Sequence, residues 1–397
     1  MDAEGLERTE IEADERIAAL DRFRGLAIAL MIAFGAAMMF VDTDFFVRFS
    51  THDTTRSFQL IEGYGFYDVI APLFVFASGL SFCVSHAAAV RKFGSVAARK
   101  RGLRHGAEVI GIGGLLLFDF STPLGIAFFS LAMVTLTLFV ASFVWKKRSE
   151  RLRKILRTFL IAFGVAVIVL NVAETALYGA FDHAYVTHWG PLCSIGCGML
   201  ICVFIADLSC ARRVAFSYLF VLFCGCLHLV LPARLFSDFT HGGILGAVGY
   251  ALLFVLANVA MSLRKQRLIR IAFVTPLYLG AGLSAAAEAC SKASVNLPYV
   301  LTSFAIAFSL YTVFEGTEGF RARYPVLTVL GRNSLTAYCL HFAMSFTYGI
   351  CLNALVSYLP IEGAIPIVLY GIGMLSYVYL ASFVLRTLER KKWIVKL

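Results

Sequence analysis

Long apolar stretches alternate with short polar segments along nearly the whole chain. A helix needs about 20 predominantly apolar residues to cross the hydrocarbon of a bilayer. The pattern predicts an all-α membrane protein with twelve spans, near residues 23–41, 66–86, 105–120, 124–145, 158–178, 190–208, 214–232, 242–262, 271–290, 298–316, 331–354 and 363–385. The third of these stretches is short and runs into an acidic, proline-containing segment at 119–123, so eleven spans with a re-entrant segment are an alternative to twelve.

Composition agrees with this class. Hydrophobic residues make up 59% of the chain and charged residues 15%, whereas soluble domains carry about 25% charged residues. No linker or repeat separates the apolar stretches, so we expect an acidic cytoplasmic tail over residues 1–15 and one transmembrane domain over 16–397. The first apolar stretch has no small-residue cleavage site, and we expect it to be a retained span.

The distribution of positive charge predicts the orientation. With the N-terminus in the cytoplasm, 31 of the 35 Lys and Arg residues fall in cytoplasmic segments, and the outside keeps Arg48, Arg56, Arg234 and Lys292. This asymmetry follows the positive-inside rule and places both termini in the cytoplasm. The net charge of +10 is then a property of topology, and we expect lipid contacts but no nucleic-acid partner. A multi-pass protein of the cytoplasmic (inner) membrane is predicted.

Polar residues at the ends of the first two spans are candidates for chemistry. Asp21 and Arg24 lie three residues apart at the cytoplasmic start of the first span, on one helix face. The alternative is an acidic residue that complements the helix dipole. On the outer side, His52 and Glu62 precede Asp68, a carboxylate at the mouth of the second span. A carboxylate entering hydrocarbon indicates a functional site, although Asp68 can also be a helix N-cap and His52 a solvated loop residue.

A third group of polar residues opens a late span. Asn333 or Ser334 is expected to cap this helix, and Ser334, Tyr338 and His341 fall on one stripe, facing either a site or a hydrogen-bonded core. On the cytoplasmic side, the basic run at 99–101 determines topology first and is also a candidate to bind phosphates of a cytosolic cofactor or of lipids. None of the His, Cys and acidic residues has the spacing of a metal site.

Three motifs resemble one known family. The sequence LDRFRG at 20–25 is similar to the start of polytopic transmembrane acyltransferases. The segment DVIAPLFVFASG at 68–79 resembles their heparan-α-glucosaminide N-acetyltransferase-like branch. The segment GRNSL at 331–335, with Tyr338 and His341, is similar to a late motif of that branch. Together the motifs extend over residues 16–345.

The resemblance implies transfer of an acyl group, with acetyl expected, from cytosolic acetyl-CoA or another acyl-CoA to a sugar or cell-envelope glycan on the far side of the membrane. The attacking amine or hydroxyl must lose a proton to a general base, and no metal is implied. From the motifs and the resemblance together we expect catalysis by Asp68 with His52 or Glu62 of the outer loop, acceptor binding by Asp21, Asn333, Ser334, Tyr338 and His341, and CoA binding by Arg24, Arg99, Lys100, Arg101 and His105.

One departure from the family pattern leaves other functions open. Phe58 occupies the position of the family's active histidine, and Glu62 replaces an asparagine. His52 or Glu62 is then the alternative base. A secondary transporter that relays protons through intramembrane carboxylates and histidines is the first rival, and a family member without catalytic activity is the second.

Overall fold

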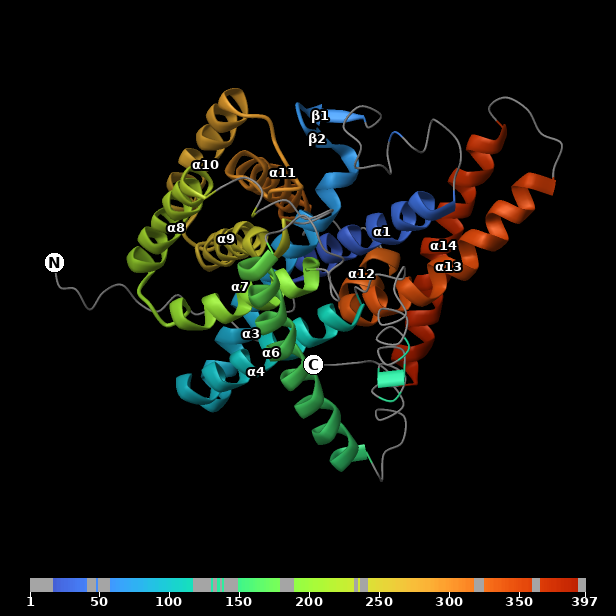
Figure 1. The fold of residues 1–397 in the computed structure, drawn as a ribbon, viewed down its shortest axis with the longest axis horizontal. Helices are drawn as coiled ribbons and strands as arrows, with labels where there is room; N and C mark the ends of the chain where they lie inside the picture. Colours follow the sequence, from blue (N-terminus) through green and yellow to red (C-terminus); the bar gives the residue numbers. More distant parts are fainter. Residues whose placement is uncertain are drawn as a thin grey trace.

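The computed structural model of the chain is a bundle of helices (Figure 1). It describes residues 17–40, 58–116, 149–178, 189–231, 242–317, 325–358 and 365–391, together with positions 48, 130, 134, 135, 138 and 235. All structural statements below refer to these residues.

The described elements are helical except for one small hairpin. The helices are α1 (Ala18–Phe40), α3 (Ile70–Phe93), α4 (Ser95–Leu116), α6 (Ser149–Tyr178), α7 (Pro191–Ile205), α8 (Cys210–Val230), α9 (Gly243–Ser262), α10 (Arg267–Ala287), α11 (Leu297–Gly316), α12 (Pro325–Arg332), α13 (Ser334–Tyr358) and α14 (Ile365–Arg390). Strands β1 (Gln59–Ile61) and β2 (Tyr64–Gly65) pair antiparallel, and a 3₁₀ turn η1 (Phe66–Val69) leads into α3.

Eleven of the predicted spans coincide with helices, and the twelfth, near 124–145, lies largely outside the described residues. Seven of the described helices are long and apolar enough to cross a membrane. The chain is therefore an all-α, multi-pass membrane protein. The sequence did not predict the short helix α12, and α4 begins ten residues earlier than expected, at Ser95, so that it includes the basic run at 99–101.

Helix α9 forms the centre of the bundle. Its residues from Gly249 to Ser262 are all buried, and it packs against α3, α7, α8 and α11. A helix that is apolar all round is stable in such a position, because every face is covered by another helix. Its one amide, Asn258, donates a hydrogen bond from Nδ2 to the carbonyl oxygen of Gly79 on α3, at 3.5 Å.

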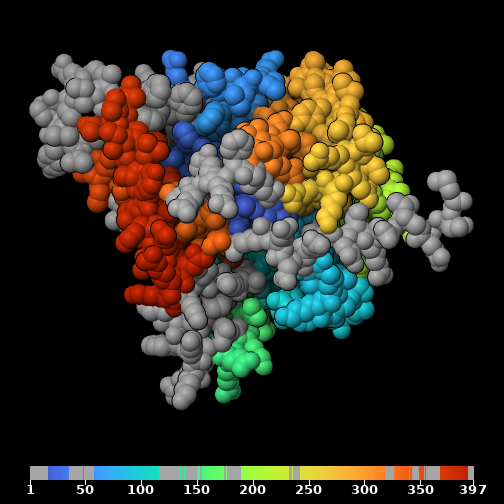
Figure 2. All heavy atoms as spheres, turned by 180° about the vertical axis from the view of Figure 1, so that it is seen from behind, coloured from blue at the N-terminus to red at the C-terminus, as the bar shows by residue number. Residues whose placement is uncertain are grey.

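Helices α8 and α10 lie at the periphery, with large apolar side chains exposed, such as Leu229 and Leu268 at 88% and 82%. In a membrane this surface faces lipid. Seen from behind, α14 occupies one edge of the molecule in red and the orange residues of α10 lie along the opposite edge (Figure 2).

Two glycines allow α1 and α12 to cross in close contact. A Cβ on Gly25 would lie 1.9 Å from the carbonyl oxygen of Leu327, and a Cβ on Gly331 would lie 1.8 Å from that of Asp21. Any side chain at either position would force the helices apart. The motifs at 20–25 and 331–335, far apart in sequence, are therefore joined through their glycines.

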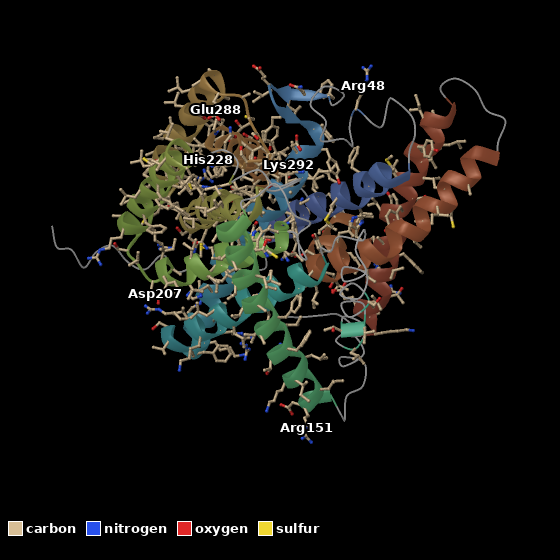
Figure 3. All side chains as sticks on the ribbon, in the orientation of Figure 1. Arg48, Arg151, Asp207, His228, Glu288 and Lys292 are labelled. Atoms are coloured by element: carbon tan, nitrogen blue, oxygen red, sulfur yellow. The ribbon has the colours of Figure 1, made fainter. Side chains whose placement is uncertain are left out.

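The two ends of the bundle carry different elements. We call the end that carries the β1–β2 hairpin the hairpin end and the opposite one, which carries the C-terminus of α3 and the N-termini of α4 and α6, the basic end. Lys292 lies below the hairpin and Arg151 at the basic end (Figure 3). The prediction from the distribution of positive charge is that the basic end faces the cytoplasm.

Candidate active site and its two cavities

A cavity of about 410 Å³ opens at the basic end, between α3, α4 and α6. We call it the basic cavity. Its polar lining is cationic because α3 ends and α4 begins with Lys and Arg side chains at this point. It is lined by Phe82, Ser85, His86, Ala88, Ala89, Lys92, Phe93, Ala98, Arg101, Gly102, Arg104, His105, Glu108 and Arg157.

A second cavity of about 270 Å³ continues from the first towards the hairpin end. We call it the serine cavity, because three serines of α3, Ser78, Ser81 and Ser85, line it. They are spaced three and four residues apart and so share one helix face. The two cavities have Phe82, Ser85 and His105 in common, so they are adjoining parts of one hollow. The remaining lining is Arg24, Phe74, Val109, Leu192, Ile195, Met199, Ser334 and Leu335.

The two cavities together are lined by most of the length of α3. Their lining on α3 reaches from Phe74, near the hairpin end, to Lys92 at the basic end. At a rise of 1.5 Å per residue, this distance is about 27 Å, close to the thickness of the hydrocarbon, about 30 Å. The two cavities thus offer space for a long ligand lying along α3.

A buried carboxylate organises the wall of the basic cavity. Glu108 is 2% exposed, and its Oε1 lies 3.5 Å from Arg104 Nε and 3.7 Å from Arg157 Nε. Its Oε2 lies 3.9 Å from His105 Nδ1, beyond hydrogen-bonding distance. One carboxylate thus faces two guanidinium groups, and the wall keeps a net positive charge that suits an anionic ligand.

Not all of the predicted CoA-binding residues reach these cavities. Arg101, His105 and Arg24 are lining residues, whereas Arg99 and Lys100 are not. Arg99 instead donates from Nε to Asp207 Oδ2 at 2.7 Å, and Asp207 Oδ1 lies 3.8 Å from His86 Nε2. Arg99 therefore contacts the turn that follows α7, whereas Arg101 faces the cavity. Successive residues of a helix point in different directions, so one basic run cannot direct all of its side chains into one cavity.

The crossing of α1 and α12 places several predicted residues together. Arg24 donates from Nη2 to the hydroxyl of Ser334, and both line the serine cavity. Asp21 is 6% exposed, with Oδ2 3.9 Å from Arg332 Nε. Asn333 lies between α12 and α13: its Nδ2 donates to the Val329 carbonyl of α12 at 3.0 Å, and its own carbonyl accepts from Ala337 N of α13 at 2.8 Å.

Tyr338 and His341 lie further along α13. The ring of Tyr338 stacks on Phe74, with centroids 5.5 Å apart, behind the wall of the serine cavity. His341 is half-buried, and its carbonyl accepts from the hydroxyl of Tyr377 at 3.4 Å. Of the predicted stripe, Ser334 reaches a cavity, while Tyr338 and His341 are not among its lining residues.

Asp68 is held in an ion pair near the hairpin end. It is 2% exposed, its Oδ2 accepts from the backbone N–H of Gly65 at 3.0 Å, and its Oδ1 lies 3.6 Å from Lys292 Nζ. Asp68 is therefore not the N-cap considered for it: Gly65 is the N-cap of η1, and Asp68, three residues later, accepts from the Gly65 backbone as in a capping box. A carboxylate that is buried to this extent needs a positively charged partner, and Lys292 provides it. The pair lies about 9 Å beyond Phe74 along α3, outside the serine cavity.

The α10–α11 loop places Lys292 beside Asp68. Asn296 holds this loop: its Oδ1 accepts from Ser291 N at 2.9 Å, and its Nδ2 donates to Glu288 Oε1 at 3.1 Å. Burial lowers the pKa of Lys292 from 10.5 to about 8, and the Asp68 carboxylate opposes this shift. The Lys292 ammonium also lies 5.5 Å from the ring centre of Tyr67, a cation–π contact.

The hairpin itself packs on the same loop. The carbonyl of Glu62 accepts from Cys290 N at 3.1 Å, and the Glu62 side chain is exposed. Gly63 has a φ of 75°, and a Cβ there would lie 2.1 Å from the Cys290 carbonyl oxygen, so both conformation and space require glycine. His52 lies outside the described residues.

Sequence reasoning missed several lining residues. The serines of α3 were detectable, because their spacing is that of one helix face, but within an apolar stretch such serines also commonly bond to their own helix. Lys292 was identified only as one of four outer cations. Its pairing with Asp68 depends on the packing of α3 against the α10–α11 loop and leaves no signal in sequence.

No group of three or more His, Cys, Asp or Glu side chains among the described residues is arranged to hold a metal ion.

Comparison with known proteins supports one of the functions considered. A model of the family described as heparan-alpha-glucosaminide N-acetyltransferase, catalytic, matches residues 16–122. This range includes α1, the hairpin, α3 and α4, and so most of the lining of both cavities. The match confirms the resemblance predicted from the motifs. No curated protein matches the chain.

Proposed function

We propose, from the match of residues 16–122 to the heparan-α-glucosaminide N-acetyltransferase catalytic family, that this membrane protein transfers an acetyl or other short acyl group from acyl-CoA in the cytoplasm to a sugar or glycan on the opposite side. The observation that carries the proposal is the pair of adjoining cavities, cationic at the basic end and extending for about 27 Å along α3.

The basic cavity suits the nucleotide part of CoA. Lys92, Arg101 and Arg104 line it, and cationic side chains bind phosphate oxygens with charge-assisted hydrogen bonds. Phe93 is 47% exposed at the same place, with the Lys92 and Arg101 cations 5.3 Å and 5.4 Å from its ring centre. An exposed ring of this kind offers a stacking surface for the adenine base.

The serine cavity suits the amide-containing arm of CoA. The hydroxyls of Ser78, Ser81 and Ser85 donate to carbonyls of their own helix, those of Phe74, Ala77 and Phe82, at 2.8, 2.7 and 3.2 Å. Each oxygen then keeps lone pairs that can accept a hydrogen bond. A row of acceptors complements the amide N–H groups of the arm, which would carry the thioester towards the hairpin end.

The transfer step needs a base at the acceptor. The amine or hydroxyl of the acceptor attacks the thioester carbonyl, a C–N or C–O bond forms, the C–S bond breaks and the CoA thiolate leaves. The proton lost by the acceptor passes to the base, which we place at His52 or Glu62, both in the segment that precedes α3. Asp68, already bonded to Gly65 and Lys292, is a positioning residue in this scheme.

A binding experiment with matched variants tests the donor site. Purified protein in detergent is titrated with acetyl-CoA, with free CoA and ATP as controls, and the thermal midpoint is followed, because a ligand specific for the folded state raises it. Arg101→Gln removes a lining cation, and we expect binding to weaken about tenfold or more, the loss of a charge-assisted hydrogen bond.

Lys100→Gln is the matched control. It removes the same charge from the adjacent position of α4, which does not line the cavity, and we expect near wild-type affinity. Equal losses in both variants would show a general effect of charge, and folded protein that does not bind either CoA form would overturn the proposal.

A further inference from the structure

A third cavity, of about 520 Å³, lies between α10 and α11 at the basic end. We call it the α10–α11 cavity. It shares no lining residue with the basic cavity or the serine cavity. Three arginines line it, Arg264, Arg267 and Arg270, together with one carboxylate, Glu315. The function proposed above makes no use of it.

The single carboxylate does not balance the three cations. Arg264 Nε donates to Glu315 Oε1 at 2.9 Å, and Arg270 Nη1 donates to Oε2 at 2.7 Å, so both oxygens of Glu315 are occupied. The guanidinium of Arg270 also stacks on Phe308, with Cζ 4.8 Å from the ring centre. Arg267 is exposed. The lining therefore carries two positive charges in excess, and it suits an anion.

The surroundings of the cavity are those of a lipid-facing groove. Its walls continue from the arginines to Ile271 and Val274 along α10, and Ile271 is 61% exposed. Leu279 and Leu283, further along the same helix, are 63% and 73% exposed. Helix α10 lies at the edge of the bundle (Figures 1 and 2). A cationic site at the membrane interface thus adjoins an apolar strip directed into the hydrocarbon.

We propose that the α10–α11 cavity binds an anionic phospholipid, with the headgroup phosphate on Arg264 and Arg267 and an acyl chain along the exposed apolar side chains of α10. Basic pockets between helices on the cytoplasmic side recognise anionic headgroups in this way. A soluble phosphate satisfies the arginines alone, whereas a phospholipid also covers the apolar strip, which is why we assign the site to lipid. The proposal does not depend on the acyltransferase function.

Delipidated protein in detergent provides the test. Palmitoyl-oleoyl phosphatidylglycerol is added, and the bound lipid is counted by native mass spectrometry while the thermal midpoint is measured in parallel. Phosphatidylcholine with the same chains and inorganic phosphate are the comparison ligands. We expect retention and stabilisation by phosphatidylglycerol alone.

The variant Arg267→Gln removes an exposed cation and leaves both bonds to Glu315 in place. We expect the affinity for phosphatidylglycerol to fall about fivefold, the factor that corresponds to about 1 kcal/mol for one interfacial cation. Arg212→Gln, at an exposed position in the first turn of α8, is the control and should bind as the wild type does.

Three results would overturn the proposal: equal binding of phosphatidylcholine, equal stabilisation by inorganic phosphate, or equal effects of the two substitutions. A loss of acetyl-CoA binding in Arg267→Gln, with lipid binding unchanged, would reassign the cavity to the nucleotide.

Discussion

Asp68 and Lys292 show how a charged pair is tolerated deep in this protein. Their side chains are 3% and 9% exposed, and neither charge has access to bulk water. Each ion loses hydration free energy on burial and regains part of it from the other. The second carboxylate oxygen of Asp68 accepts a backbone hydrogen bond from Gly65, so both oxygens have a polar partner.

The first prediction at this scale concerns the loss of one partner. Asp68→Asn leaves Lys292 buried without its carboxylate, and we expect destabilisation of about 3–5 kcal/mol, seen as a lower thermal midpoint in detergent. The double variant Asp68→Asn/Lys292→Met removes both charges and should recover much of the loss. A single variant as stable as the wild type would show that the pair does not contribute in this way.

The second prediction is a pH dependence. The pKa of Lys292 is about 8 in the folded protein and 10.5, its usual value, in the unfolded chain. Between pH 8 and pH 10.5 the unfolded chain therefore binds more protons than the folded protein does. Stability relative to a Lys292→Met variant should therefore be greatest above pH 10.5 and decrease as the pH falls towards 8. Thermal midpoints of both proteins across this range test it, and parallel curves would contradict it.

At the scale of helices, the packing of α1 on α12 is decided by glycine. Backbone atoms of the two helices approach so closely at Gly25 and Gly331 that no Cβ fits. The polar contacts of Arg24 with Ser334 and of Asp21 with Arg332 form only because the helices meet at this distance. The glycines thus determine one wall of the serine cavity.

A pair of glycine substitutions tests this conclusion. Gly25→Ala places a methyl group 1.9 Å from the Leu327 carbonyl oxygen, and we expect destabilisation of about 1–3 kcal/mol, as for an overpacked core. Gly282→Ala, on α10, has no atom within 4 Å of the new Cβ and should be neutral or slightly stabilising. Thermal midpoints in detergent distinguish the two, and similar values would exclude a steric role for Gly25.

At the scale of the whole molecule, the adjoining cavities form a hollow that follows most of the length of α3. Six of the described helices, from distant parts of the chain, supply its lining residues: α1, α3, α4, α6, α7 and α13. A ligand that enters at the basic end and fills this hollow would reach Phe74, about 9 Å along the chain from Asp68.

Filling the hollow tests its role. In Ser81→Leu a larger apolar side chain occupies the serine cavity, and we expect acetyl-CoA binding to weaken about tenfold, since the arm loses space and an acceptor. Thr158→Leu, an exposed position on α6, is the control for added bulk. Thermal-shift titration with acetyl-CoA gives both values. Unchanged binding by Ser81→Leu would show that the ligand does not enter this cavity.

The sequence by itself determined the class of this protein and most of its helices, because apolar stretches of about 20 residues have few stable alternatives in a membrane. It also identified Asp21, Arg24, Asp68, Arg101 and Ser334 as residues of interest, since polar side chains are conspicuous in such stretches. Only the tertiary structure decided which of them meet. The partner of Asp68, the separation of Arg99 from Arg101 and the row of serines beside Arg24 all depend on how helices pack, and close packing is a property of three-dimensional shape, with no local signal along the chain.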